Sequence, residues 1–134
     1  MDMVKVVCGI IYNEEGQVLL CRRNADKSLA GYWEFPGGKV EAHETQEASL
    51  CRELLEELGM RVTVGNHFHS VVHAYDTVTI ELIAYLCQYR EATFVLTDHD
   101  LYQWVREHQL LDWQLAPADI PIARLLIEAN AEPV

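Results

Sequence analysis

The sequence has no apolar run long enough to cross a bilayer, and it has few basic residues. Its 134 residues include 10 Lys and Arg against 21 Asp and Glu, which gives a formal net charge of −11 at pH 7. A spanning helix needs about 20 apolar residues, and binding to DNA, RNA or an anionic membrane needs a basic surface. We therefore expect no membrane and no polynucleotide partner. An anionic small molecule can still be a partner if metal ions supply positive charge.

Paired cysteines, targeting signals and linkers are also missing. No Cys-x-x-Cys pair and no zinc-finger histidine spacing occur among the four cysteines, Cys8, Cys21, Cys51 and Cys87. This excludes a disulfide framework and a structural zinc site, and it predicts buried thiols. The opening "MDMVKVVCGIIY" does not have the pattern of a secretory signal, so we expect a cytoplasmic protein. Without repeats or linkers, residues 1–134 are expected to form one domain.

The apolar patterns predict strands on both sides of a central helix. "VKVVCGIIY" and "QVLLCRR" are typical of two adjacent strands joined by the turn "NEEGQ". Further strands are expected in "MRVTVGNHFHSVVHAY", in "TVTIELIAYLCQY" and, more briefly, in "LYQWV". Asp119 and Pro121 open a last amphipathic helix at about 120–130. This order suggests a mixed sheet covered by helices on its faces.

The central helix is expected over residues 45–58. Thr45 can cap it, Glu47 lies in its first turn, and Gly59 supplies a left-handed end. At about 100° per residue, an apolar face and an acidic face should lie on opposite sides. The apolar face is expected to contain Cys51, Leu54, Leu55 and Leu58.

Three glutamates crowd the acidic face of this helix. Glu53 stands three and four residues before Glu56 and Glu57, and each like-charge pair at such spacing costs a few tenths of a kcal/mol. A solvated acidic face is the ordinary interpretation of such a helix. However, Arg52 is its only cation, and the preceding "PGGK" can offer backbone carbonyls. Carboxylates with a carbonyl are the ligands that Mg²⁺ or Mn²⁺ prefers, which predicts a divalent cation here.

The spacing of these residues also matches a known signature. From Gly38 the sequence reads five residues, Glu44, seven residues, Arg-Glu-Leu, one residue, Glu-Glu, one residue and Gly59-Met60. Over 38–60 this fills every fixed position of the Nudix box, and the chain resembles Nudix hydrolases. The resemblance implies an α/β/α sandwich around a mixed sheet, and metal-dependent hydrolysis of a nucleoside diphosphate linked to a group X. It implies these site residues: Glu53, Glu56, Glu57 and the Gly37 carbonyl as metal ligands, Arg52 orienting the glutamates, and Glu44 supporting the loop.

Motifs outside the box resemble the MutT branch of the family. "LLCRR", "GYWEFPGGKVE" and "LAPADIP" are similar to this branch, especially to its CTP pyrophosphohydrolases. The expected reaction converts CTP or a modified pyrimidine deoxynucleoside triphosphate to the monophosphate and pyrophosphate, with Mg²⁺ or Mn²⁺, as nucleotide-pool housekeeping. Two alternatives are a hydrolase that removes 8-oxo-dGTP and a nucleotide-sensing domain without turnover. The sequence leaves monomer and homodimer open.

The same resemblance assigns a metal ligand or base outside the box. The branch has an acidic residue six positions before a Trp, and "DHDLYQW" places Asp98 there, ahead of Trp104. The family more often has Glu at this position, and Asp is one methylene shorter. Asp100 is the fallback, and a polar turn between strands is the ordinary alternative for both.

Three residues are candidates for contacts with the nucleotide. Asp119 matches the position that faces the base, and a carboxylate can accept from the amino group of cytosine; a helix cap is the competing interpretation. Arg23 resembles the phosphate-contacting arginine of the branch, or it is a solvated charge at a strand end. Phe35 and Trp33 lie next to the glycine loop, where aromatic side chains can wall a base pocket, and we expect this of Phe35; such residues more often belong simply to the core. The histidines, including the alternating His67 and His69, indicate no site.

Overall fold

The computed structural model describes residues 3–130. The helices are α1 (Gln46–Leu58), α2 (Asp119–Ala129) and a 3₁₀ helix, η1 (Glu107–Asp112). The strands are β1 (Met3–Tyr12), β2 (Val18–Arg23), β3 (Trp33–Glu34), β4 (Gly37–Lys39), β5 (Met60–Ala74), β6 (Thr79–Ala92) and β7 (His99–Val105).

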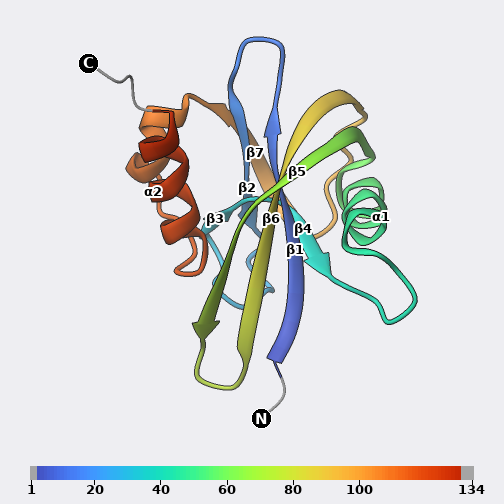
Figure 1. The fold of residues 1–134 in the computed structure, drawn as a ribbon, viewed down its shortest axis with the longest axis vertical. Helices are drawn as coiled ribbons and strands as arrows, with labels where there is room; N and C mark the ends of the chain where they lie inside the picture. Colours follow the sequence, from blue (N-terminus) through green and yellow to red (C-terminus); the bar gives the residue numbers. More distant parts are fainter. Residues whose placement is uncertain (1–2, 131–134) are drawn as a thin grey trace.

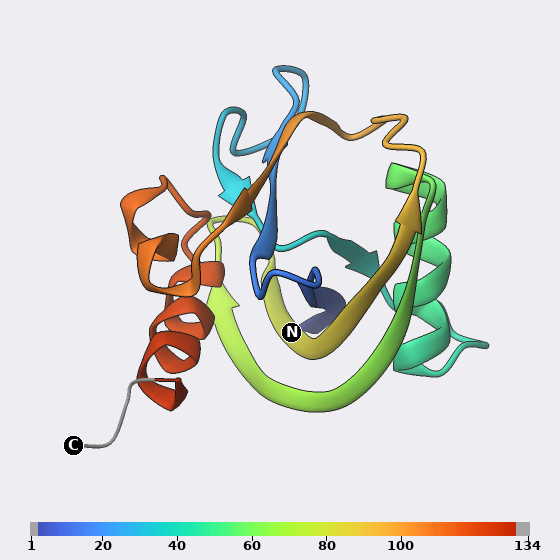
Figure 2. The same cartoon turned by 90° about the horizontal axis from the view of Figure 1, so that it is seen from above.

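All seven strands belong to one mixed sheet. The order along its main path is β3-β2-β1-β6-β5, with β4 paired to β1 and β7 paired to β2. β1 and β6 run parallel in an unbroken register from Met3↔Thr79 to Tyr12↔Gln88, whereas the other pairs are antiparallel. Figure 2 shows that β5 and β6 curve strongly around β1. The prediction of a mixed sheet flanked by helices is confirmed.

The two α-helices cover opposite sides of this sheet (Figures 1 and 2). Alternate side chains of β1 supply both cores, because successive residues of a strand point to opposite faces. Val7 and Ile11 pack in the cluster that contains Leu50, Leu54 and Leu58 of α1. On the other face, a cluster joins β1 to α2 through Cys8, Ile10, Ile122, Ala123 and Leu126.

All of the predicted helices and strands are present. The first two strands pair antiparallel beside the expected turn, the two long strands become β5 and β6, and the short one becomes β7. The last helix begins and ends one residue earlier than expected. The structure adds β3, β4 and η1, which the sequence patterns do not predict. Their residues are too few to show a period, and both short strands depend on pairing with distant partners.

Helix α1 has the expected ends, but its buried face is not the predicted one. The Thr45 hydroxyl accepts from the Ala48 N–H, and Gly59 ends the helix at φ +58°. Cys51 and Leu55, expected in the core, are exposed. Glu57, expected on the solvent side, is buried. The buried face of α1 is centred on Leu54, so the acidic face extends from solvent to the protein interior.

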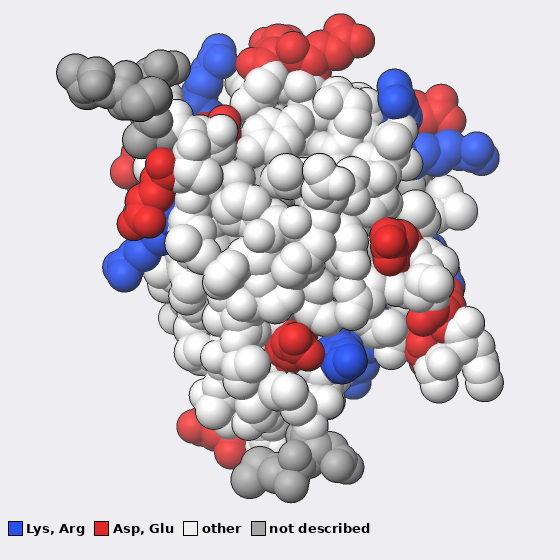
Figure 3. Space-filling view, in the orientation of Figure 1, with Lys and Arg blue, Asp and Glu red and all other residues white. Residues whose placement is uncertain are grey.

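The remaining expectations concern cysteines and the surface. Cys8, Cys21 and Cys87 are buried free thiols as predicted, and Cys51 is the exception. Within residues 3–130, no helix has the length and apolar character needed to cross a membrane. Figure 3 shows one face on which most charged side chains lie toward the margins.

Candidate active site

The glycine pair before α1 brings the chain close to both β1 and the helix. Gly37 and Gly38 pair with Cys8 and Val7 in the antiparallel β4–β1 ladder. A Cβ on Gly37 would overlap the Val7 carbonyl, and one on Gly38 would overlap the Glu53 carboxyl group. Only glycine leaves room for these approaches. The backbone of β4 therefore lies directly against the first of the clustered glutamates.

Arg52 connects the acidic residues of the loop and the helix. Its Nε and Nη2 donate to the two carboxylate oxygens of Glu44 at 2.8 and 2.9 Å, a bidentate contact. Its Nη1 donates to Glu53 Oε1 at 2.9 Å and to Glu56 Oε2 at 3.3 Å. The guanidinium lowers the pKa of Glu44, with help from the Ser49 hydroxyl. One cation thus holds three carboxylates in fixed positions.

The three glutamates of the box differ in exposure. The side chain of Glu56 is 60% exposed, that of Glu53 is 16% exposed, and that of Glu57 is 8% exposed. Burial, followed by hydrogen bonding and charge repulsion from Glu53, raises the pKa of Glu57 to about 10. A buried carboxyl group next to a second one retains its proton unless a cation compensates the charge.

A cavity of about 290 Å³ opens beside these carboxylates. We call it the carboxylate pocket; its lining includes the acids Glu53, Glu57 and Asp98 and the cations Arg23, Lys27 and Lys39. Both charge signs therefore meet in one cavity. Such a cavity can take a polyanion together with a metal ion.

Asp98 reaches this pocket because the chain after β6 is tied to the end of α1. The N–H groups of Thr93 and Phe94 donate to the carbonyls of Gly59 and Leu58 at 3.1 and 3.0 Å. Asp98 itself forms an ion pair with Lys27 at 3.3 Å. The fallback residue Asp100 is bound to Arg22 instead and does not line the pocket.

A second cavity, of about 600 Å³, adjoins the first. We call it the base pocket, after the nucleotide base that the sequence resemblance predicts beside Phe35 and Asp119; it shares Arg23, Glu34 and the glycine pair with the carboxylate pocket. Its lining also includes Phe35 and Asp119, both nearly fully buried. The base pocket is mainly apolar, as pockets for small organic ligands are.

Asp119 does not cap helix α2. The N-cap residue is Ala118, which has no side-chain capping bond, so the capping interpretation is wrong. Asp119 Oδ2 instead accepts from the Phe35 N–H at 2.8 Å. Burial and the nearby Glu34 raise the pKa of Asp119 well above its ordinary value. Its carboxyl group is therefore a polar group built into the wall of the base pocket.

Comparison with known proteins identifies the family. A family profile described as "NUDIX domain" matches residues 7–125. The chain belongs to the Nudix family. It is 38% identical to the CTP pyrophosphohydrolase of Escherichia coli (strain K12) over 131 residues, covering 98% of this chain and 96% of that protein. It is 36% identical to the 8-oxo-dGTP diphosphatase of Haemophilus influenzae over 130 residues, covering 96% and 95%.

The structural comparison agrees with this family. The crystal structure of the MutT protein from Methanosarcina mazei Go1 matches with a TM-score of 0.88 and 27% identity, covering 97% of this chain and 96% of that one. The resemblance to Nudix hydrolases of the MutT branch is thus confirmed.

Nudix hydrolases generally use divalent metal ions, and the carboxylate pocket fits such an ion. Its lining offers carboxylate oxygens as metal ligands, and burial and Glu53 raise the pKa of Glu57, which a nearby cation would lower. Among residues 3–130, no three His, Cys, Asp or Glu side chains already stand in a metal-holding arrangement. In this arrangement Glu53 and Glu56 are paired with Arg52.

Two residues that the sequence did not indicate lie next to the predicted site residues. Glu34 lines both pockets, accepts from Arg23 at 3.0 Å and lies 2.8 Å from His99 Nε2. His99, dismissed with the other histidines, is only 2% exposed. The available signals were weak: Glu34 is the polar residue between Trp33 and Phe35, and His99 directly follows Asp98.

The other candidates behave as ordinary residues. His67 and His69 are exposed on β5, and His67 is bonded to Ser70 at 2.8 Å. Trp33 packs edge-on against Trp113 and lines neither pocket.

Arg23, in contrast, lines both pockets. It is not a free solvated charge, because it is bound to Glu34 and Ser28.

Proposed function

We propose that this Nudix hydrolase is a pyrimidine nucleoside triphosphate pyrophosphohydrolase. Its substrate is CTP or a modified pyrimidine deoxynucleoside triphosphate, and its products are the monophosphate and pyrophosphate. The relative named CTP pyrophosphohydrolase, at 38% identity over nearly both full lengths, supports this assignment. In this proposal residues 1–134 act as one cytoplasmic domain with Mg²⁺, or Mn²⁺ in its place, in housekeeping of the nucleotide pool.

The observation that carries the pyrimidine assignment is the bond between Asp119 and Phe35. Because Oδ2 of Asp119 takes the Phe35 N–H, that donor is already occupied, and the second carboxyl oxygen is left for a ligand. In its ionised form this oxygen can only accept, which suits the exocyclic amino group of cytosine, whereas a base carbonyl at the same place would need the protonated form that burial favours. The pocket volume of about 600 Å³ admits either base size, so polar groups make the choice.

The carboxylate pocket would take the phosphates. Arg23, Lys27 and Lys39 bring positive charge to a cavity that opens directly from the base pocket. A guanidinium can contact two phosphate oxygens at once, so Arg23, at the junction of the two pockets, is the proposed contact for the first phosphate groups.

The metal-holding residues in this proposal are the carboxylates around that pocket and one backbone carbonyl. They are Glu53, Glu57, Asp98 and the carbonyl of Gly37, which line the pocket, together with Glu56, which lies outside its lining and is bound to Arg52. When bound, the divalent cation supplies neutralisation of phosphate charge and a lower pKa of the attacking water. Arg52 and Glu44 hold the glutamates in place for it.

The chain's own part in the reaction is positioning and proton transfer. The oxygen of a water forms a bond to phosphorus as one P–O bond of the α,β-phosphoanhydride breaks, which releases the monophosphate and pyrophosphate. A carboxylate must take the proton of that water. Glu53 and Asp98 are the candidates, because both line the pocket and neither is fully buried.

A hydrolase of 8-oxo-dGTP is the second candidate. The Haemophilus influenzae relative with that name is 36% identical, and the base pocket is large enough for a purine. A nucleotide-sensing domain without turnover is a third, but it would have no physical need to keep three mutually repelling glutamates beside a pocket.

Turnover of CTP, 5-methyl-dCTP and 8-oxo-dGTP, measured as pyrophosphate release with Mg²⁺, tests the assignment. We expect the two cytosine nucleotides to have the higher kcat/KM. The Asp119→Asn variant can keep the bond to Phe35 while it adds an N–H donor, so the ratio of kcat/KM for CTP over 8-oxo-dGTP should fall about tenfold. Equal or greater wild-type activity on the purine would contradict the pyrimidine assignment.

The Glu53→Gln variant separates an enzyme from a sensing domain. Its amide keeps the size of the side chain but removes the charge and the basic oxygen. Pyrophosphate release should fall by about a hundredfold or more when a metal ligand or base is lost. No turnover in the wild type, with nucleotide binding retained, would favour the sensing domain.

A further inference from the structure

His99 is a buried polar side chain that the proposed reaction does not yet use. It lies at the start of β7, with its ring between Glu34 of β3 and Glu57 of α1. Nε2 is 2.8 Å from Glu34 Oε2, and Nδ1 is 4.0 Å from Glu57 Oε1. Within residues 3–130, Nδ1 of His99 is the one buried side-chain nitrogen or oxygen without a hydrogen-bond partner. Such groups are rare in folded proteins and call for a physical reason.

The neighbours of His99 determine which ring nitrogen carries hydrogen. Glu34 already accepts from Arg23 Nη1 at 3.0 and 3.3 Å, so its carboxyl oxygens act as acceptors. His99 must therefore donate to it from Nε2. In the neutral ring this leaves Nδ1 as a bare acceptor facing Glu57, so no donor on the imidazole is free for another partner.

Glu34 connects His99 to Arg23 through hydrogen bonds. The carboxylate of Glu34 lines both pockets and is held by His99 on one side and by Arg23 on the other. Arg23 has a second anchor, because its Nε donates to the Ser28 carbonyl at 2.6 Å. Without His99, Glu34 would lose the hydrogen bond from a buried donor. The Glu34 and Arg23 side chains could then move together.

We propose that His99 is a positioning residue that fixes Glu34 and, through it, holds the Arg23 guanidinium at the junction of the base and carboxylate pockets. This rests on the proposed function in so far as Arg23 contacts the phosphates of a nucleotide. His99 itself touches no substrate. Its action is to hold the arginine in place for the ligand, so that binding does not have to order the side chain first.

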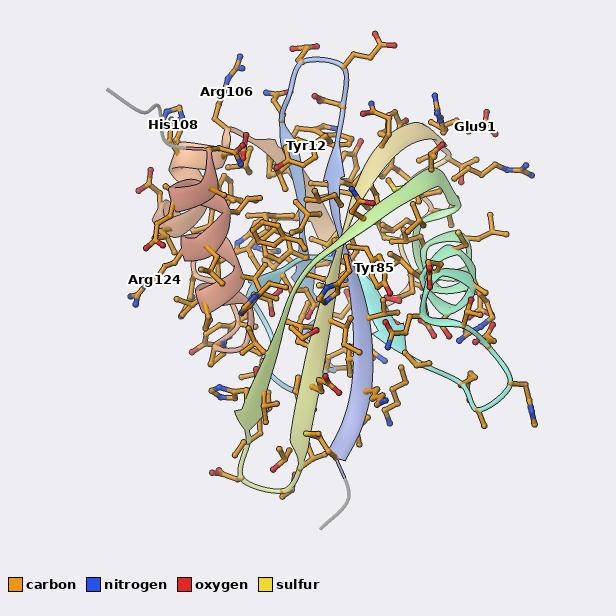
Figure 4. All side chains as sticks on the ribbon, in the orientation of Figure 1. Tyr12, Tyr85, Glu91, Arg106, His108 and Arg124 are labelled. Carbon is orange, nitrogen blue, oxygen red and sulfur yellow. The ribbon has the colours of Figure 1, made fainter. Side chains whose placement is uncertain are left out.

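Two substitutions of His99 separate positioning from simple packing. His99→Leu fills a similar volume but removes both ring nitrogens. His99→Gln carries an amide N–H that can reach the place of Nε2, so it can still donate to Glu34. His108→Leu is the matched control, because His108 is exposed beside α2 and lines neither pocket (Figure 4).

Nitrogen-15 NMR of the intact protein gives a readout that needs no substrate. We expect His99 to show the Nε2–H tautomer, and the Arg23 Nε–H signal, identified by its loss in Arg23→Lys, to be protected from solvent exchange. This protection should fall at least about tenfold in His99→Leu and be largely kept in His99→Gln and His108→Leu. An Nδ1–H tautomer, or unchanged Arg23 protection in a folded His99→Leu variant, would overturn the proposal.

Kinetics with CTP and Mg²⁺ add a second readout. His99→Leu should raise KM roughly tenfold, with a smaller fall in kcat, and His99→Gln should restore most of the loss. In the Arg23→Lys background the same change should raise KM by less than about twofold, because the two residues act in series. Equal effects in both backgrounds would mean that His99 acts only through packing. If the wild type turns over no nucleotide, the proposed function fails, and the NMR result still decides the role of His99.

Discussion

Because Glu57 is buried, we predict that replacing it with an uncharged residue stabilises the protein. In the ion-free protein its pKa is raised from 4.5 to about 10, first by burial and then by Glu53. A group whose folded pKa is raised contributes stability that is complete below the unfolded pKa and is lost as the pH rises toward the folded one. Between pH 4.5 and about 10, the free energy of unfolding should therefore fall as pH increases.

Glu57→Gln imitates the protonated side chain and should remove this pH dependence. At pH 7 the difference from the ordinary pKa corresponds to about 3 kcal/mol at most, at about 1.4 kcal/mol per pH unit. We expect the variant to be more stable than the ion-free wild type by about 1–3 kcal/mol at pH 7, since Glu53 can take up part of the repulsion. The two proteins should converge toward pH 4.5.

Urea unfolding in EDTA over pH 5–8 measures this difference. Added Mg²⁺ should stabilise the wild type more than the variant, because a cation that binds only the folded state adds to its stability. A variant that is less stable than the wild type at pH 8, or a difference that does not change with pH, would refute the reasoning.

Three further predictions concern the surroundings of the cluster. Gly38→Ala should lower the free energy of unfolding by about 1–3 kcal/mol in thermal melts, because its methyl group would overlap the Glu53 carboxyl group; an unchanged melting temperature would contradict this. Arg52→Lys should raise the Mg²⁺ concentration needed for half-maximal turnover about tenfold or more, since an ammonium cannot make the bidentate and bridging contacts; an unchanged Mg²⁺ dependence would show that these contacts do not position the ligands. Asp98→Asn should lower kcat by about a hundredfold, whereas Asp100→Asn, outside the pocket, should change it less than threefold; similar losses in both would remove Asp98 from the site.

The sequence predicted features that depend on neighbouring residues. Helix α1 follows from its apolar period, with Thr45 as cap and Gly59 as stop, because these signals act within one turn. The two long strands follow from residue type and alternation in the same way. The spacing of the glutamates along the helix also placed three acids within one turn of each other.

The remaining features depend on contacts between residues distant in the sequence. A helical period does not show where the buried arc is centred when acids and leucines share it, so Leu55 and Glu57 were assigned to the wrong sides. The Asp119 carboxyl group reaches Phe35, 84 residues away, in place of its own helix. His99 and Glu34 are 65 residues apart and meet only because β3 and β7 both pair with β2.

Binding of Mn²⁺, followed by paramagnetic broadening of assigned amide signals, tests the central claim most directly, because it locates the ion without reference to turnover. The account predicts that broadening is centred on Gly38, Glu53, Glu57 and Asp98, and that it is strongly reduced in Glu53→Gln. Absence of ion uptake at millimolar Mn²⁺, or broadening centred elsewhere on the protein, would contradict the claim that these carboxylates form a metal site.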